Sequence, residues 1–291
     1  MKLTITLLFL FTNLLSAQVK GIIKDSISGK PIPFVNIWVE NENIGASSEE
    51  NGEFIINTTE KSKNLIFSAL GFEKKILKIS DASVVKLKPT AYQLDEVVVF
   101  KTLGTKVIEI GKTQSTTYQA FDNGPKIDTK YFPYLPKYKK TKYIKQVNIE
   151  TDSKIDEATI RLHFYSVDAN GFPGEEIIKK DFIVTVKNGL KKTFFDLKDY
   201  SLKMPKTGIF IGFEKLIIEK NKFEKTITDS NSNTTKIQKT YYPYVLYNSV
   251  EREFQFTFSG GKWNKQTKYN TDGTLAKMRI NEPAINLILT N

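Results

Sequence analysis

Residues 29–72 read GKPIPFVNIWVENENIGASSEENGEFIINTTEKSKNLIFSALGF, a run of short alternating segments separated by turn residues. Every second residue in 34–39 is a valine or isoleucine, which predicts a strand with one fully apolar face. The Asn51-Gly52 pair predicts a tight hairpin turn, because both residue types tolerate a positive φ angle. Residues 54–56 then form the predicted return strand. This stretch predicts antiparallel β structure.

The same pattern continues on both sides of this stretch. Further short strands are predicted at 65–69, 76–77, 84–87 and 97–99. About seven strands fall between Val19 and Val99, and none of the segments has a helical period. We therefore expect an all-β fold that begins with a small β-sandwich.

Residues about 18–90 resemble the carboxypeptidase-like regulatory domain, and residues 94–99 resemble the segment that follows this domain in outer-membrane receptors of the Bacteroidetes. The residues that carry the first resemblance are Gly21, Asp25, Pro31-Ile32-Pro33, Asn36-Ile37, Gly45, Asn51-Gly52-Glu53-Phe54 and Ser68-Ala69-Leu70-Gly71-Phe72. The resemblance implies a transthyretin-like sandwich of seven strands. It also implies folding and interaction roles, because this family is the non-catalytic accessory of metallocarboxypeptidases. It brings no catalytic residue to this chain.

Residues 1–17 have the features of a secretory signal peptide. Lys2 precedes an apolar run over 3–15, and Ser16-Ala17 supplies small residues before the predicted cut. The run is too short to span a bilayer, and a buried N-terminal strand is the alternative. Since no cysteine follows, a lipoprotein anchor is not expected. We therefore expect an exported protein of the periplasm or the outer-membrane surface.

Composition sets further limits. The 291 residues suffice for two ordinary domains, and the absence of cysteine leaves stability to the hydrophobic cores. The net charge of +11 either attracts acidic neighbours in the envelope or belongs to lysines spread over a solvated surface. Export argues against nucleic acid as a partner. After the N-terminus no apolar run approaches about 20 residues, so no transmembrane segment is expected and any membrane association would be peripheral.

The predicted domains are a carboxypeptidase-like regulatory domain over 18–100, a linker over 101–139 and a larger β-sandwich over 140–291. Glycines and prolines interrupt the linker, although 101–112 retains a strand-like pattern. About eight strands are predicted in the last domain, which is typical of a jelly-roll-like sandwich of two sheets.

Two segments of this larger sandwich stand out. Residues 251–259 form its clearest predicted strand, with Phe254, Phe256 and Phe258 on one face. Residues 220–240 are polar and rich in Asn, Ser, Thr and Lys. They predict a long exposed loop or hairpin, a kind of segment that often carries binding functions.

No residue is assigned a catalytic role. His163, the only histidine, alternates with Leu162 and Phe164 and is predicted at the surface. The sequence has no HExxH or GxSxG motif. Asp168–Gly171 resembles part of a calcium loop but lacks the later glutamate ligand. Carboxylates that could pair for acid–base chemistry, or simply solvate turns, are Asp168, Glu175 and Glu176, and Asp25, Glu49, Glu50 and Glu53. We expect no metal, no cofactor and no enzymatic activity.

Aromatic residues interleaved with lysines form the candidate ligand site. They lie in 130–140 and 241–247, and a tryptophan follows a Gly-Gly turn at 260–261. Such rings can stack on sugars while lysines attract anionic groups, or they can pack between the linker and the sandwich. The candidate ligand-binding residues are Tyr131, Tyr134, Tyr138, Tyr242, Tyr244 and Trp263.

These observations favour an interaction or scaffolding module that contacts other envelope proteins through sandwich edges and loops. A glycan-binding protein that uses the tyrosine-rich strips is the first alternative. A hydrolase that uses carboxylates alone is the second. The expected partner is therefore an envelope protein or a glycan.

Overall fold

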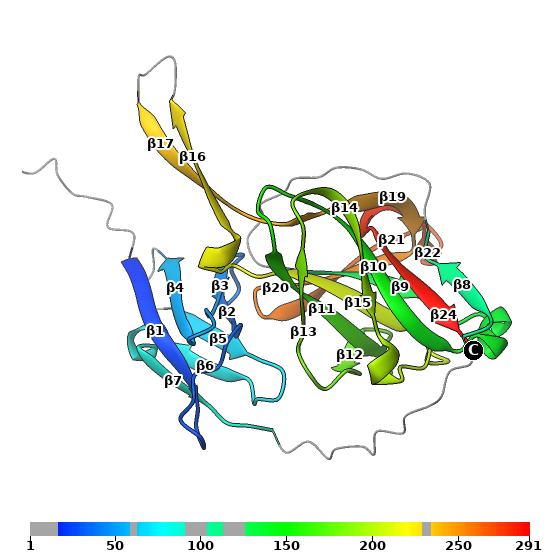
Figure 1. Ribbon diagram of the computed structural model, residues 1–291, viewed down its shortest axis with the longest axis horizontal. Helices are drawn as coiled ribbons and strands as arrows, with labels where there is room; N and C mark the ends of the chain where they lie inside the picture. The colour runs from blue at the N-terminus through cyan, green and yellow to red at the C-terminus, as the bar shows by residue number, and fades with distance from the viewer. Residues whose placement is uncertain (1–16, 59–62, 91–103, 113–125, 229–233) are drawn as a thin grey trace, which may run out of the picture.

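The computed structural model describes residues 17–58, 63–90, 104–112, 126–228 and 234–291. They form two β-sandwiches side by side, the N-terminal sandwich within residues 17–90 and the C-terminal sandwich within residues 104–291 (Figure 1). The predicted signal peptide up to residue 16, and the segment 94–99 with its predicted strand, lie outside the described residues. In the described part of the chain the helices are short 3₁₀ turns, and none is long and apolar enough to cross a membrane.

Seven strands of the described residues build the N-terminal sandwich, which confirms the predicted seven-strand fold. They are β1 (Ala17–Asp25), β2 (Asn36–Val39), β3 (Gly45–Ser47), β4 (Glu53–Thr58), β5 (Asn64–Ser68), β6 (Lys75–Lys78) and β7 (Val84–Leu87). One sheet has the strand order β4-β1-β7 and the other has the order β3-β2-β5-β6. Neighbouring strands are antiparallel except for β1 and β7, which run parallel.

The core of the N-terminal sandwich lies between these two sheets. In β4 burial alternates strictly, with Phe54, Ile56 and Thr58 buried and the residues between them exposed. The Phe54 ring meets Phe67 edge to face, with centroids 5.7 Å apart. The apolar face predicted for β2 also points into this core, whereas Trp38 on the opposite face is buried against the other sandwich.

The predicted Asn51-Gly52 turn leads into β4. Gly52 has a φ of +78°, and a Cβ atom there would lie 2.7 Å from the carbonyl oxygen of Ile23. The side-chain oxygen of Asn51 accepts a hydrogen bond from the Glu53 N–H at 3.0 Å. The turn therefore requires glycine for both its backbone conformation and its close contact with β1.

The C-terminal sandwich contains two large sheets. Its strands are β8 (Val107–Ile110), β9 (Ile127–Phe132), β10 (Tyr143–Ser153), β11 (Ala158–Val167), β12 (Pro173–Glu176), β13 (Phe182–Val186), β14 (Gly189–Asp196), β15 (Ile209–Lys215), β16 (Lys222–Thr228), β17 (Thr235–Tyr241), β18 (Tyr244–Val245), β19 (Tyr247–Arg252), β20 (Phe254–Ser259), β21 (Lys262–Tyr269), β22 (Leu275–Ala276), β23 (Met278–Pro283) and β24 (Ile285–Thr290). One sheet has the order β14-β10-β24-β8, with β18 beside β10. The other has the order β12-β11-β15-β9-β20-β21-β22, with β13 beside β11. The outcome confirms the predicted all-β fold of two sandwiches.

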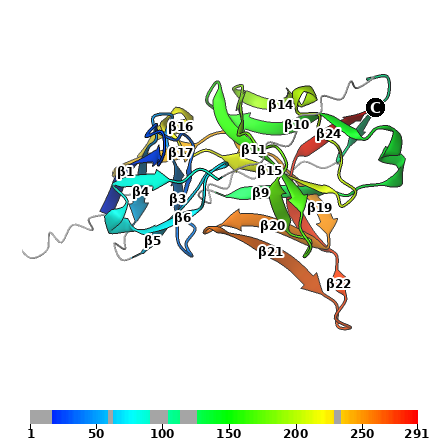
Figure 2. The same cartoon turned by 90° about the horizontal axis from the view of Figure 1, so that it is seen from below.

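Two apolar layers flank the second of these sheets. The main core between the sheets includes Leu162 and Phe164 of β11 and Leu287 of β24. A second layer covers the opposite face, where Phe210 packs against Phe256 of β20. It forms because β20 and β21 turn away from β15 and β9 and come over this face (Figure 2). Both faces of β11 and β15 are therefore buried.

Strands β8 and β9 lie in the range predicted as a linker, 101–139. β8 pairs with β24, and β9 pairs with both β15 and β20 inside the larger sheet. β9 reads IDTKYF, and its Asp128 and Lys130 are buried among side chains that bond them. A strand whose buried residues are polar lacks the apolar alternation by which strands are predicted.

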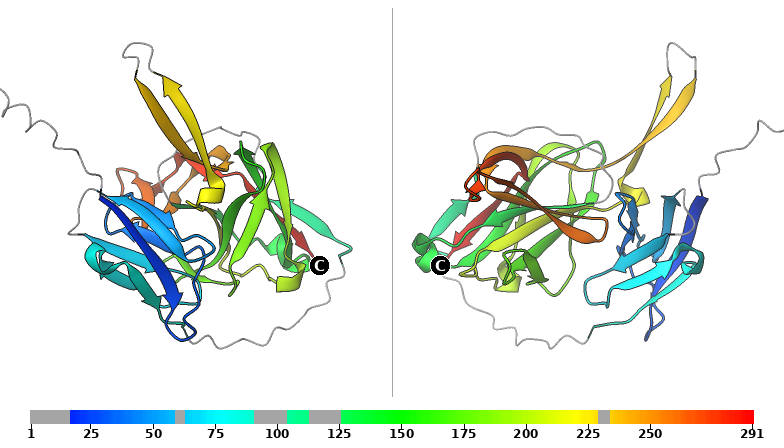
Figure 3. Two further views of the ribbon diagram at one scale, coloured as in Figure 1. Left: turned by 60° about the vertical axis from the view of Figure 1, so that its left-hand side comes forward. Right: turned by 180° about the vertical axis from the view of Figure 1, so that it is seen from behind.

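The projecting hairpin consists of β16 and β17, which in the described residues pair only with each other. It lies in the segment predicted as an exposed loop or hairpin. In the views of Figures 1 and 3 it points away from both sandwiches. The described strands of this segment therefore form a two-stranded arm at the junction of the two sandwiches.

Candidate functional site

Hydrogen bonds between side chains of one sandwich and the backbone of the other join the two sandwiches. The Arg161 guanidinium donates from Nη2 to the carbonyl oxygen of Phe34 at 2.6 Å. Ser47 Oγ accepts a hydrogen bond from the Ile217 N–H at 3.1 Å. Phe34 has a φ of 54°, a strained value for a bulky residue that persists only where the surroundings hold it. Arg161 supplies part of that support from the other sandwich.

A continuous chain of aromatic contacts crosses the same interface. Trp38 of the N-terminal sandwich meets Phe258 edge to face, with centroids 5.8 Å apart. Phe258 contacts Trp263 at 5.2 Å, and Trp263 contacts Tyr165 at 5.3 Å. The Tyr165 ring stacks on His163 at 5.2 Å. The interface is thus packed directly onto the second apolar layer of the C-terminal sandwich.

The turn between β20 and β21 also contacts the N-terminal sandwich. Gly261 has a φ of +80°, and a Cβ atom there would lie 2.5 Å from Ile66 Cδ1. Lys74 Nζ donates to the Gly261 carbonyl oxygen at 3.1 Å. Only glycine allows this contact.

A buried charge cluster lies behind the interface, and its buried members are Arg161 and His163 of β11 and Glu214 of β15. It extends to the half-buried Glu176 of β12 and to Asp181, an exposed residue just before β13. Arg161 Nη1 lies 3.2 Å from Glu214 Oε2, and Arg161 Nε lies 3.2 Å from Asp181 Oδ1 without hydrogen-bond geometry. His163 joins two carboxylates, with Nδ1 2.5 Å from Glu176 Oε1 and Nε2 2.7 Å from Glu214 Oε2. The cluster therefore alternates positive and negative groups.

The cluster fixes the protonation of its members. Burial alone would lower the pKa of His163, but Glu176 and Glu214 outweigh burial and raise it to about 9. Burial would raise the pKa of Glu214, but Arg161 and His163 hold it below its usual value. Burial raises the pKa of Asp181, with partial opposition from Arg161. At neutral pH His163 is therefore a cation with both nitrogens engaged, which suits an ionic link and not a general base.

The prediction that His163 lies at the surface is wrong, because its exposed fraction is 7 %. Alternation in β11 does not separate a core face from a solvent face, since both faces are covered and every residue from Ala158 to Tyr165 is buried. Its partner Glu214 is 51 positions away, so no local motif marks the pair. The sequence of β11, ATIRLHFYSV, gives no signal of this burial, because its polar residues alternate with apolar ones as in a strand with one solvent face.

The first predicted carboxylate group, Asp168, Glu175 and Glu176, does not converge on one site. Asp168 Oδ1 accepts hydrogen bonds from the N–H groups of Asn170 and Phe172 and so closes a turn. Glu175 pairs with Lys179 at 3.4 Å, while Glu176 joins the buried charge cluster. In the part of the chain that the structure describes, no group of three or more acidic or histidine side chains could hold a metal ion.

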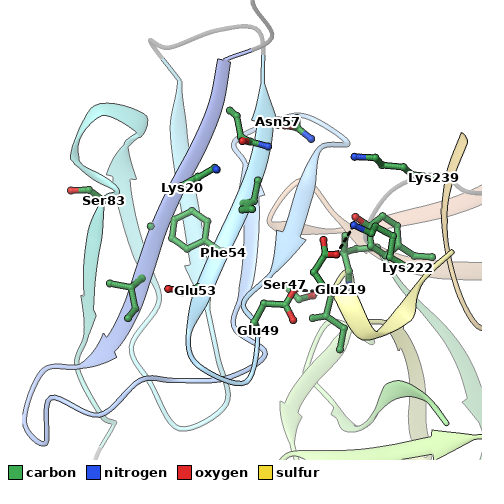
Figure 4. Close-up of a pocket in the computed structure, with 17 residues that line it drawn as sticks. Lys20, Ser47, Glu49, Glu53, Phe54, Asn57, Ser83, Glu219, Lys222 and Lys239 are labelled. Carbon is green, nitrogen blue, oxygen red and sulfur yellow. Dashed lines mark hydrogen bonds and ion pairs between the residues drawn. The ribbon is translucent and has the colours of Figure 1, made fainter. Parts of the chain in front are cut away.

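An interdomain cleft of about 640 Å³ lies between the N-terminal sandwich and the base of the projecting hairpin. Lys20 and Asn57 lie on the wall formed by β1 and β4, and Lys222 and Lys239 lie on the opposite wall (Figure 4). Two residues of the second predicted carboxylate group, Glu49 and Glu53, also line this cleft.

Glu49 connects the two walls of the cleft. Its Oε1 accepts a hydrogen bond from the Glu219 N–H at 2.8 Å. Burial raises the pKa of Glu49, although this hydrogen bond opposes the shift. Glu219 in turn forms an ion pair with Lys222 at the start of β16. The hairpin base is thereby tied to the N-terminal sandwich.

Buried hydrogen bonds also anchor the hairpin to the C-terminal sandwich. Asn221 is fully buried, accepts from the Thr159 N–H at 2.7 Å and donates to the carbonyl oxygens of Thr159 and Leu216. Phe223 at the base packs edge to face on Tyr242, with centroids 5.9 Å apart. The hairpin therefore starts from a fixed base.

Beyond this base the hairpin is exposed on both faces. All its residues from Glu224 to Thr228 and from Thr235 to Lys239 are exposed. Two of them are isoleucines, Ile227 with an exposed fraction of 43 % and Ile237 with 62 %. Because each strand pairs on one side only within the described residues, each offers an outer edge of backbone N–H and C=O groups.

Four of the predicted ligand-binding residues belong to the main core. Tyr138 and Tyr242 are buried, with exposed fractions of 4 % and 5 %, so their rings cannot serve as a platform for a ligand. Tyr134 packs on Tyr138, and Tyr244 packs on Tyr242. These four tyrosines pack within or against the main core of the C-terminal sandwich, which agrees with a packing role and not with a ligand platform.

The remaining two predicted residues lie in the second apolar layer. Trp263 belongs to the aromatic chain at the interface. Tyr131 instead lines an aromatic pocket of about 480 Å³. The six predicted residues therefore form no common strip. The lining of this pocket includes Tyr131, Phe210, Phe254, Arg252, Gln255 and Glu282.

Sequence comparison finds a family similar to the N-terminal sandwich. Residues 19–99 match the family model of the CarboxypepD_reg-like domain, in agreement with the resemblance in the sequence. Domains of this family are non-catalytic β-sandwich modules. The search of curated proteins finds no match to the chain. The match covers the N-terminal sandwich and leaves the C-terminal sandwich and the projecting hairpin to be interpreted from their geometry.

Proposed function

We propose that the protein is a non-enzymatic interaction module of the cell envelope, and that it contacts a protein partner through the projecting hairpin. The observation that carries this proposal is an exposed two-stranded arm on a fixed base. Asn221 and Glu49 hold that base, whereas Ile227 and Ile237 are presented to solvent. Exposed apolar side chains beside open strand edges are typical of surfaces that bind another chain.

The chemistry of the hairpin defines the partner. An extended segment can add to an outer strand edge through backbone hydrogen bonds, while its side chains contact the flanking isoleucines. The described strands carry four lysines, Lys222, Lys225, Lys236 and Lys239, and one glutamate, Glu224. This excess of positive charge favours an acidic extended segment.

Location and lack of catalysis belong to the same proposal. The charge, apolar run and small residues of 1–17 support export to the periplasm or the outer-membrane surface. The non-catalytic family of the N-terminal sandwich supports an interaction role. His163, held as a cation by two carboxylates, is not arranged to abstract a proton.

A capture experiment tests the proposal. Purified protein spanning 18–291 is immobilised and exposed to solubilised envelope, with and without prior protease digestion of that envelope. We expect a retained protein that disappears after digestion. Ile237→Pro removes one N–H from the edge of β17 and should abolish this retention, because proline cannot donate to a strand ladder.

Phe194→Asp is the matched control. Phe194 lies on β14, the edge strand of the sheet with the order β14-β10-β24-β8 in the C-terminal sandwich. Its exposed fraction of 57 % resembles the 62 % of Ile237. This variant should retain the partner as the unmodified protein does. Retention that survives Ile237→Pro, or that is lost only in Phe194→Asp, would refute a role for the hairpin.

A further inference from the structure

We infer that the aromatic pocket of the C-terminal sandwich binds a neutral saccharide of a few sugar units. The pocket lies between β9 and β15 of the large sheet and the strands β19, β20 and β23. Its volume is within the range of roughly 300–1,000 Å³ that is usual for small-molecule sites. The site is independent of the projecting hairpin, none of whose residues line it.

Four aromatic rings line the pocket, those of Tyr131, Phe210, Phe254 and Phe256, and the first three form one cluster. Tyr131 lies against Phe210, with centroids 4.9 Å apart, and against Phe254, with centroids 5.7 Å apart. Phe210 is buried and fixes the other two, which are half-buried and face the pocket. Flat rings held in this way offer apolar faces on which the C–H face of a sugar ring can lie.

Polar side chains that line the same pocket supply directed hydrogen bonds. Glu282 accepts from Arg252 Nε at 3.0 Å and from Arg252 Nη2 at 2.8 Å, which orients the guanidinium. Arg252 Nη1 also donates to the Glu251 carbonyl oxygen at 2.9 Å. The side chain remains 44 % exposed, so the second N–H of each Nη atom can donate to a ligand. Gln255 donates to the Asn281 carbonyl oxygen at 2.6 Å and keeps its own side-chain oxygen as an acceptor.

The charges around the pocket balance, unlike those of the whole chain. The lining holds Glu251, Glu253 and Glu282 against Arg252 and Lys277, and Lys130 pairs with Glu282 from behind at 3.2 Å. Although the chain as a whole carries +11, this site has no excess of positive charge to favour an anion. Apolar rings beside balanced donors and acceptors suit an uncharged ligand rich in hydroxyl groups.

Titration calorimetry with defined saccharides tests this inference. The probes are maltotriose, cellotriose and mannotriose as neutral ligands, and trigalacturonate as the anionic comparison. We expect saturable binding of at least one neutral trisaccharide with a Kd of about 1 mM or tighter. Tyr131→Ala should weaken this binding by about tenfold, because it removes one stacking ring.

Two measurements guard against a folding artefact. Tyr134→Ala is the matched control, since this half-buried tyrosine lies outside the pocket and should leave binding unchanged. Hydrogen–deuterium exchange of the unmodified protein with the bound trisaccharide should protect 251–256 and 277–282. No binding of any neutral probe, preference for trigalacturonate, unchanged binding in Tyr131→Ala, or protection elsewhere would each overturn the inference. Ile237→Pro should bind the saccharide normally, so the hairpin proposal and this one can fail separately.

Discussion

The stability of the protein should fall as the pH rises from 6.5 to 9, and His163 should be the cause. The chain has one histidine and no cysteine, so no other side chain has an ordinary pKa in this interval. The pKa of His163 is about 9 in the folded protein and 6.5 in the absence of its partners. The folded state therefore keeps a proton that the unfolded state releases.

The sign and size of the effect follow from this difference. Because the pKa is higher in the folded state, the stabilisation is complete below pH 6.5 and is lost as the pH rises through 9. The loss amounts to about 3 kcal/mol in the free energy of unfolding. Within the window the slope should approach about 1.4 kcal/mol per pH unit, which corresponds to one proton.

Two assays check this prediction. Urea unfolding at a series of pH values gives the free energy of unfolding. The imidazole C–H resonances of the one histidine, followed in a proton NMR titration, give its pKa in the folded state. His163→Gln removes the titrating group, so its free energy of unfolding should stay flat across the window. It should be lower than that of the unmodified protein at pH 6.5 and approach it at pH 9. A flat profile in the unmodified protein, or the same slope in His163→Gln, would refute the reasoning.

Three further substitutions probe the interface and the charges behind it. Arg161→Met should cost about 3–5 kcal/mol in urea unfolding, because it removes one of the two cations that compensate the buried carboxylate of Glu214, whereas Arg252→Met at a half-exposed pair should cost clearly less. Trp38→Ala should cost about 3–5 kcal/mol and separate the unfolding of the two sandwiches in calorimetry; a single unchanged transition would contradict this. Gly261→Ala should lower the melting temperature more than Gly273→Ala, because both have a φ of +80° but only Gly261 meets another side chain.

The N-terminal sandwich was predictable because its information is local. The Asn51-Gly52 turn and the alternation of β4 each depend on residues adjacent in the chain. The hairpin at 220–240 was predictable for the same reason, since its polar composition matches its exposure. Where neighbours in the sequence determine the structure, the pattern of residue types is sufficient.

The C-terminal sandwich was harder to predict because distant residues determine which side chains are buried. Lys130 reads as a surface lysine, yet it is buried, and its ammonium group forms an ion pair with Glu282 and donates a hydrogen bond to the Gly111 carbonyl oxygen. His163 reads as a surface residue, yet strands far along the chain cover it. Tyrosines grouped in the sequence were likewise dispersed, since Tyr131 lies on β9 in the second apolar layer, whereas Tyr134 and Tyr138 follow this strand and pack in the main core. The spacing of apolar residues along a strand carries no information about contacts with residues that are distant in the sequence.

The position of β24 has a consequence for how the chain folds. This strand lies between β10 and β8 in its sheet, and Asn286 bonds Glu109, a residue 177 positions earlier. β8 therefore stays without its neighbour until almost all of the intervening chain has been synthesised. Contacts over such separations cost much chain entropy before they are formed, so folding of this sandwich should be slow and concerted. Removal of residues 285–291 would take out a central strand, and we expect it to prevent folding of the entire sandwich.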